Sequence, residues 1–157
     1  MYDPPLAYFI TFRTFGTWLH GDVRGSVDRY HNEFGTPVLK ADPDLEAEAE
    51  AKMCREAVVL TPAQRVIIDR TIREVCTHKE WYLRALNVRT NHVHAIVSST
   101  RPPEFIMNAL KSWGTRRLVE AGEWARGDRL WSRHGSTRYL FKEEDVNHEI
   151  KYVMEGQ

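Results

Sequence analysis

Two histidines that stand two residues apart, His92 and His94, are the residues of this sequence best placed to do chemistry. They lie in the run 91–97, which is otherwise mostly apolar. If this run is a β-strand, both imidazoles point to one side, while Val93 and Ala95 point to the other side, toward a core. Neighbouring imidazoles on one strand face can share a metal ion. The alternative is a solvent-facing strand that carries two histidines by chance, so the rest of the chain must decide.

Hydrophobic patterning predicts the elements that position this pair. Runs rich in aromatic, β-branched or alternating residues predict strands at 8–18, 81–88, 92–98 and 130–141. Apolar residues at helical spacing predict helices at 61–78, 102–122 and from 143 onward. Thr61, Pro62 and Gln64 match the start of a helix with a capping box. Gly16 is expected to mark a bulge or a close backbone approach, and Gly135 is expected to bend its strand.

The predicted order is strand, helix, strand, strand, helix, strand and a last helix. This order is the split βαβ pattern of ferredoxin-like α+β domains. We therefore expect an antiparallel sheet of four to five strands with helices on one face and an added C-terminal helix. The histidine pair would then point from the open face of the sheet. With 157 residues, the chain is expected to form a single domain over 1–157.

Composition narrows the class of protein. The hydrophobic fraction of 42% and the charged fraction of 28% are those of an ordinary soluble protein, and no apolar run approaches a membrane span. The N-terminus lacks the features of a signal peptide. Cys54 and Cys76 lack metal-binding spacing and are interpreted as free thiols. We therefore expect a cytoplasmic protein that does not contact membranes.

Charge is balanced in total but uneven along the chain. Lysine and arginine number 22 and aspartate and glutamate also number 22, which argues weakly against nucleic-acid binding. However, acidic residues gather in 42–50 and basic residues in 111–142. In 130–141 the basic residues alternate with aromatic ones, a mixture that suits stacking on bases and pairing with phosphates. A solvated edge strand is the alternative for this segment.

The last predicted helix carries an aromatic residue outside its apolar stripe. Val146, Ile150, Val153 and Met154 form the stripe. At roughly 100° per residue, Tyr152 lies about 200° around the helix from Ile150. Tyr152 is therefore expected on the polar face, where it has either a function or the ordinary exposure of a surface tyrosine.

Together these features resemble the single-tyrosine HUH transposases, especially the REP-associated tyrosine transposases. The resemblance rests on His92-Val93-His94, on Tyr152-Val153 downstream, on 130–132 and on the opening strand, and it spans residues 8–157. It implies that Tyr152 attacks a phosphodiester in single-stranded DNA, leaving a 5′-phosphotyrosine linkage and a free 3′-hydroxyl. It also implies that His92 and His94 hold a divalent metal ion, Mg²⁺ or Mn²⁺, at the scissile phosphate.

The third metal ligand departs from the family pattern. The family often places a glutamine one helical turn after the tyrosine, whereas this chain has Gly156 there, followed by Gln157. Gln157 is the expected third ligand. Glu155 and His148 lie within about a turn of Tyr152 and are the alternatives.

The resemblance also implies a partner, which is single-stranded or hairpin DNA. In this family the tyrosine helix serves its own site or that of a partner subunit, so a homodimer is one assembly that it implies. The residues expected to contact DNA are basic, with one tryptophan as a stacking partner: Lys111, Arg116, Arg117, Trp131, Arg133 and Arg138.

Two other classes of function fit the same residues. A non-catalytic module could bind single-stranded nucleic acid with the same sheet and a degenerate metal site. A metal-dependent hydrolase could use His92, His94 and a carboxylate with water as the nucleophile, although this leaves Tyr152 without a role.

Overall fold

The computed structural model of the protein describes residues 3–17 and 57–155. Its internal contacts divide the chain into two compact units, residues 1–14 with 59–157, and residues 15–58. In the second unit the described residues are 15–17 and 57–58, where the Val58 N–H donates to the Phe15 carbonyl at 2.9 Å. The expectation of a single domain stays a prediction. All of the described helices and strands lie in the first unit.

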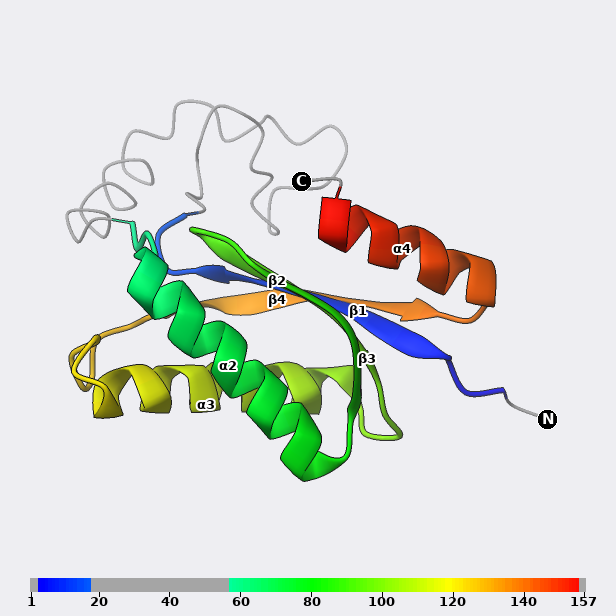
Figure 1. Cartoon of the computed structure of the whole chain (residues 1–157), viewed down its shortest axis with the longest axis horizontal. Coiled ribbons are helices and arrows are strands. Elements are labelled where there is room, and N and C mark those ends of the chain that lie inside the picture. Colours follow the sequence, from blue (N-terminus) through cyan, green and yellow to red (C-terminus); the bar gives the residue numbers. More distant parts are fainter. Residues whose placement is uncertain (1–2, 18–56, 156–157) are drawn as a thin grey trace, which may run out of the picture. The chain divides into compact units, whose positions relative to one another are not determined.

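The first unit is an α+β fold, as predicted. Its elements are β1 (Ala7–Thr14), α2 (Pro62–Lys79), β2 (Tyr82–Val88), β3 (His92–Ser98), α3 (Pro103–Glu120), β4 (Trp131–Leu140) and α4 (Glu143–Glu155), as Figure 1 shows. The strands form one antiparallel sheet in the order β2-β3-β1-β4. This order is that of the ferredoxin-like split βαβ arrangement, so the predicted architecture is confirmed.

Both faces of the sheet are covered. Helices α2 and α3 lie on one side and α4 lies on the other (Figure 1). Under α4, a separate apolar cluster joins the sheet to the helix and consists of Ala7, Phe9, Ala85, Ile96, Leu140, Val146 and Val153, with Ile150 packed against it. The face expected to be open is thus partly covered, because α4 buries its apolar stripe there.

Helix α2 shows how local sequence sets an element. The Thr61 hydroxyl accepts from the Gln64 N–H at 3.1 Å, and the Gln64 side-chain oxygen accepts from the Thr61 N–H at 2.9 Å. This is the predicted capping box. The helix ends at Lys79, and the capping residue that follows, Glu80, takes a left-handed φ of 61°. The predicted stripe is buried and comprises Ile68, Ile72, Val75 and Cys76.

Strand β1 ends earlier than the predicted range of 8–18. It stops at Thr14, because residues 15–17 form a turn in which Gly16 adopts a φ of 81°. Glycine adopts this φ without steric cost, so Gly16 ends the strand instead of placing a bulge within it.

The bulge lies instead in β4, beside Gly135. Phe12 pairs with Gly135 and Thr14 pairs with Trp131, so β1 advances two residues while β4 advances four. A side chain at Gly135 would place its Cβ 2.5 Å from the Thr11 carbonyl oxygen. The strand is therefore irregular at Gly135, where the sequence predicted a bend, and it shows a close backbone approach next to two extra residues of β4.

None of the described helices combines the length and the apolar composition that crossing a membrane requires.

Candidate active site

The sheet face that α4 covers carries a row of polar side chains, one from each strand. Asn87 pairs with His94, His94 pairs with Thr11, and Thr11 pairs with Ser136 in the strand register. Residues directly opposite one another in a sheet project to the same side. The row therefore brings an amide, an imidazole and two hydroxyls together across the whole sheet.

His92 and His94 point to the same side, as predicted, and their ring centroids lie 4.7 Å apart. His94 is buried and His92 is half-buried. The Nδ1 of His92 lies 2.7 Å from the Asn91 side-chain oxygen, and the Nδ1 of His94 lies 2.8 Å from the Thr11 hydroxyl. Because an amide oxygen only accepts, this contact requires a proton on the His92 Nδ1, and in the neutral ring Nε2 then carries the lone pair. A hydrogen bond on one ring nitrogen that orients the other is typical of metal-binding histidines.

Tyr152 lies on α4 beside this pair. Its ring centroid is 5.9 Å from that of His94 and 6.1 Å from that of Phe9, and the residue is 44% exposed. The prediction that Tyr152 lies off the buried stripe is confirmed. The expectation for Met154 is wrong, because Met154 is 58% exposed while Glu149 is buried with Val146 and Val153.

The last turn of α4 is tied to the sheet by a hydrogen bond from the Asn87 side-chain amide to the Val153 carbonyl, at 2.9 Å. Asn87 neighbours His94 in the register, so this bond links the tyrosine helix to the row that holds the histidine.

A pocket of about 260 Å³ opens where these groups meet, between the sheet and α4. Its lining comprises Phe9, Thr11, His94, Ser136, Arg138, Glu149 and Tyr152. It therefore combines a nucleophilic phenol, an imidazole, two hydroxyls and a guanidinium–carboxylate pair around one aromatic ring. Such a set can bind a phosphate group and present the phenol to it.

The family model described as "Transposase IS200 like" matches residues 52–154. The chain belongs to the IS200-like transposase family. Within this family the predicted resemblance to tyrosine transposases is confirmed. A comparison with curated proteins found no match.

Two solved structures are similar to this IS200-like transposase in fold. One is a REP-associated tyrosine transposase bound to a REP hairpin, with 12% identity and a TM-score of 0.52 over 98% of this chain and 67% of that one. The other is a transposase-like protein from Deinococcus radiodurans R1, with 18% identity and a TM-score of 0.53 over 99% of this chain and 93% of that one.

The basic residues predicted to contact DNA fall on both sides of the sheet. Arg138 lines the pocket, and Arg133 is exposed in the β4 bulge. Arg116 and Arg117 lie on α3, across the sheet from Tyr152. One phosphate cannot contact both groups, so any DNA contact at α3 is separate from the pocket.

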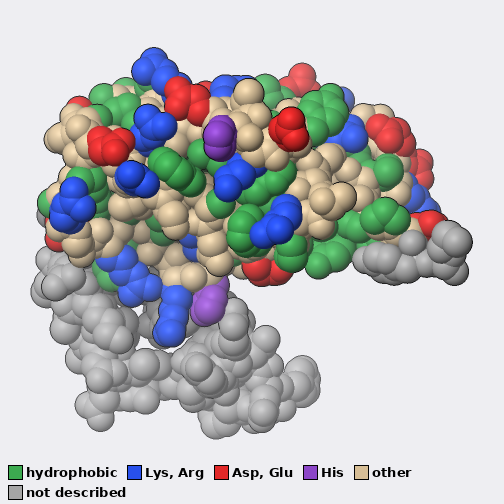
Figure 2. All heavy atoms as spheres, turned by 90° about the horizontal axis from the view of Figure 1, so that it is seen from below, with side chains coloured by type: hydrophobic (Ala, Val, Ile, Leu, Met, Phe, Trp, Pro, Cys, Tyr) green, Lys and Arg blue, Asp and Glu red, His purple; other side chains and the backbone are tan. Residues whose placement is uncertain are grey.

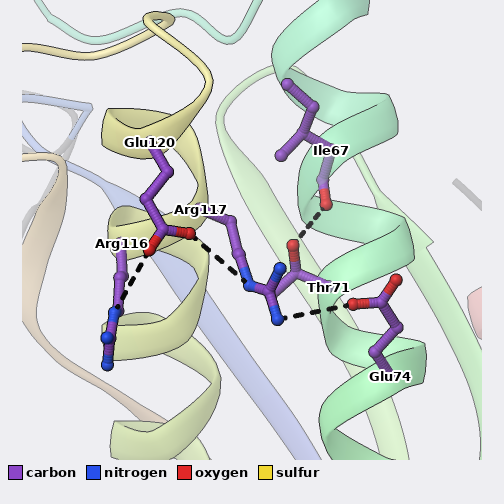
Figure 3. Close-up of polar contacts among 6 residues, drawn as sticks. All are labelled: Ile67, Thr71, Glu74, Arg116, Arg117 and Glu120. Carbon is purple, nitrogen blue, oxygen red and sulfur yellow. Dashed lines mark hydrogen bonds and ion pairs between the residues drawn. The ribbon is translucent and has the colours of Figure 1, made fainter.

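The two α3 arginines, Arg116 and Arg117, form ion pairs with acidic neighbours. Arg117 lies 3.8 Å from Glu74 of α2 and 3.9 Å from Glu120, and Arg116 lies 3.5 Å from Glu120 (Figure 3). Acidic and basic side chains are interspersed over the face seen in Figure 2, which looks onto the α2–α3 side. This face is therefore mixed in charge, and the DNA contacts of Arg116 and Arg117 stay a prediction.

Lys111 and Trp131, both predicted to contact DNA, are buried. The Lys111 ammonium donates to the carbonyls of Ser132 at 3.1 Å and His134 at 3.4 Å, inside the β4 bulge. Burial lowers the pKa of Lys111, and Arg129 lowers it further. Trp131 packs edge-on against Phe12 and donates to the Lys111 carbonyl. Both residues support the bulge from the α3 side, which leaves neither side chain exposed to a DNA strand.

The predicted third metal ligand, Gln157, lies outside the described residues. Of its alternatives, His148 and Glu155 are both exposed, and neither lines the pocket. Among the described residues no group of three histidine, cysteine, aspartate or glutamate side chains is arranged to hold a metal ion. Residues 18–56, with Cys54 and the acidic run 42–50, also lie outside the described residues.

Sequence reasoning missed five residues of the site, namely Thr11, Asn87, Asn91, Ser136 and Glu149. Asn91 is the neighbour of His92 in the sequence. Its role as a hydrogen-bond acceptor could therefore have been predicted from its position. The others reach the site only through strand pairing or helix packing, for which spacing along the chain gives no signal.

Proposed function

We propose that this transposase cleaves and rejoins single-stranded DNA through a covalent bond to Tyr152. The observation that carries the proposal is the 5.9 Å separation of the Tyr152 and His94 rings at one pocket. Membership of the IS200-like family supports DNA as the substrate. The hairpin bound to the REP-associated relative supports hairpin DNA as its form.

In the cleavage step the Tyr152 phenol oxygen forms a bond to phosphorus while the bond from phosphorus to the 3′-oxygen breaks. The phenol loses its proton and the departing 3′-oxygen gains one. The product is a 5′-phosphotyrosine linkage and a free 3′-hydroxyl. Because the phosphodiester energy is kept in the linkage, attack by a 3′-hydroxyl can rejoin DNA without a high-energy cofactor.

His92 and His94 suit a divalent cation, Mg²⁺ or Mn²⁺, with Gln157 as the proposed third ligand. Their rings are adjacent, and hydrogen bonds at Nδ1 favour ligation through Nε2. A cation held there supplies charge neutralisation at the phosphate.

The test is incubation of end-labelled hairpin DNA carrying a single-stranded extension with the protein and Mn²⁺, followed by a denaturing gel. Wild type should give a protein-linked DNA band that Tyr152→Phe abolishes. Tyr82→Phe is the matched control, because Tyr82 is 63% exposed on β2 and does not line the pocket.

Three other results would select against this proposal. An adduct that survives Tyr152→Phe would remove Tyr152 from the mechanism. DNA binding without an adduct would select the non-catalytic binding module. Cleaved DNA ends without a protein-linked species would select a hydrolase that uses water.

A further inference from the structure

The pocket beside Tyr152 contains an ion pair that the proposed chemistry does not use. Arg138 of β4 and Glu149 of α4 approach to 2.6 Å, with the Glu149 side chain 8% exposed and the Arg138 side chain 62% exposed. A buried carboxylate is costly unless it is paired, so Glu149 depends on this contact. The exposed guanidinium, in contrast, has five N–H donors and satisfies the carboxylate through one nitrogen.

The Arg138 guanidinium makes a second contact, with the aromatic ring of Phe9. Its guanidinium carbon lies 5.7 Å from the centroid of the Phe9 ring, and Arg138 and Phe9 are paired in the strand register. The same Phe9 ring lies 5.4 Å from the His94 ring and 6.1 Å from the Tyr152 ring. The guanidinium and the nucleophile therefore stand around one aromatic ring.

Glu149 also ties this arginine to the tyrosine helix. It precedes Tyr152 by three residues on α4, which places the two side chains about one helical turn apart. Among the described residues, a second titratable group beside Glu149 is His148, whose Nε2 lies 3.9 Å from the other carboxylate oxygen. Any movement of α4 would thus change the orientation of the guanidinium together with that of the phenol.

We infer that Arg138 binds a phosphate of the DNA strand in this pocket and that Glu149 is a positioning residue for it. The inference rests on the proposed function of the site. A planar guanidinium offers two parallel N–H donors to phosphate oxygens, a geometry that lysine cannot reproduce. A carboxylate that holds the guanidinium in place reduces the side-chain entropy lost on binding.

The Arg138–Glu149 ion pair predicts that DNA affinity and the rate of adduct formation respond differently to substitution. Because Glu149 offsets the charge of Arg138, the pair orients a phosphate more than it attracts DNA from a distance. Glu149→Gln adds a net positive charge, so its DNA affinity should equal or exceed that of wild type. Adduct formation should nevertheless slow, because the guanidinium is no longer held in place.

The experiment measures single-turnover adduct formation on the labelled hairpin DNA with Mn²⁺, together with DNA affinity. Arg138→Lys and Glu149→Gln should each slow adduct formation by about 10- to 100-fold, the value of a charge-assisted hydrogen bond. Glu143→Gln is the matched control, because it removes an α4 carboxylate that lies 3.9 Å from Arg84, away from the pocket. It should react at the wild-type rate.

A second readout separates contact with phosphate from support of the fold. A series of substrates carries one methylphosphonate each, which neutralises one phosphate at a time. Wild type should be slowed at one particular linkage, and Arg138→Lys should be insensitive to neutralisation at that linkage alone. Slow variants that keep the wild-type sensitivity at every linkage would overturn the phosphate contact.

The two proposals fail in different ways. Absence of an adduct with wild-type protein would reject the proposed function. A wild-type adduct with Arg138→Lys and Glu149→Gln reacting at the normal rate would reject this inference alone.

Discussion

Single side chains in this protein depend on partners that are distant in sequence. His92 and His94 were predictable because alternation along one strand is a local property. The hydroxyl that orients His94 belongs to Thr11, 83 residues earlier, and only the pairing of β1 with β3 brings it close. The histidine pair is therefore visible in the sequence, whereas the hydrogen bonds that set its ring orientation are not.

Replacing Thr11 by valine keeps the side-chain shape and removes the hydrogen bond to His94. If the histidines hold a cation, Mn²⁺ affinity should fall by about 10- to 100-fold, as is typical when a group that orients a metal ligand is lost. Isothermal titration calorimetry measures this. Thr137→Val is the control, because its hydroxyl bonds Glu104 of α3 instead. Equal Mn²⁺ affinity for Thr11→Val and wild type would contradict the role assigned to the hydroxyl.

Cys76 gives a pH-dependent prediction. Burial raises the pKa of its thiol from 9.0 to about 11. Between these values the unfolded chain ionises at Cys76 while the folded chain keeps the proton, so the free energy of unfolding should fall as pH rises from about 9 to 11.

Urea unfolding at several pH values tests this in a Cys54→Ser background, which removes the other thiol of the sequence. Adding Cys76→Ala should make the fall in unfolding free energy less steep. Parallel pH profiles for the two proteins would show that the Cys76 thiol titrates alike in the folded and unfolded states.

Among the elements, β4 departs most from a regular pattern. Its glycine was predicted to mark an irregularity, and the structure gives the reason in the close approach to the Thr11 carbonyl. The burial of Lys111 was not predictable, because helical spacing places it off the apolar stripe and says nothing of carbonyls in a bulge. The carbonyls of Ser132 and His134 in the bulge, which accept from the Lys111 ammonium, explain why a lysine is buried there.

Gly135→Ala should destabilise the fold by about 1–3 kcal/mol, because the added Cβ meets a backbone oxygen that cannot shift without disturbing β1. Chemical denaturation followed by circular dichroism measures the change. Gly114→Ala is the matched control on α3, where an added Cβ makes an ordinary contact of 3.6 Å with Trp131. It should be neutral or stabilising by up to about 1 kcal/mol, since alanine favours helix. Similar losses in both variants would contradict the steric explanation.

For the molecule as a whole, element order was predictable and the placement of α4 was not. An amphipathic stripe shows that a helix packs against something, but it does not say on which face of the sheet. Here the stripe of α4 packs on Phe9 and Ile96, the same face that carries the histidines. This packing brings Tyr152 to the His94 of the same chain and supports action of the tyrosine in its own site.

The same packing yields a test that distinguishes the two assemblies. Tyr152→Phe and His94→Ala should each abolish the DNA adduct, and a mixture of the two proteins should also form none, because neither chain holds a complete site. Mixed chains that formed an adduct would show that α4 is exchanged between subunits, since only a partner could then supply the missing phenol. Val146 and Val153 of α4 are fully buried against the sheet, and exchange would require both to leave it. A longer incubation of the mixture should therefore leave the result unchanged unless that cluster opens.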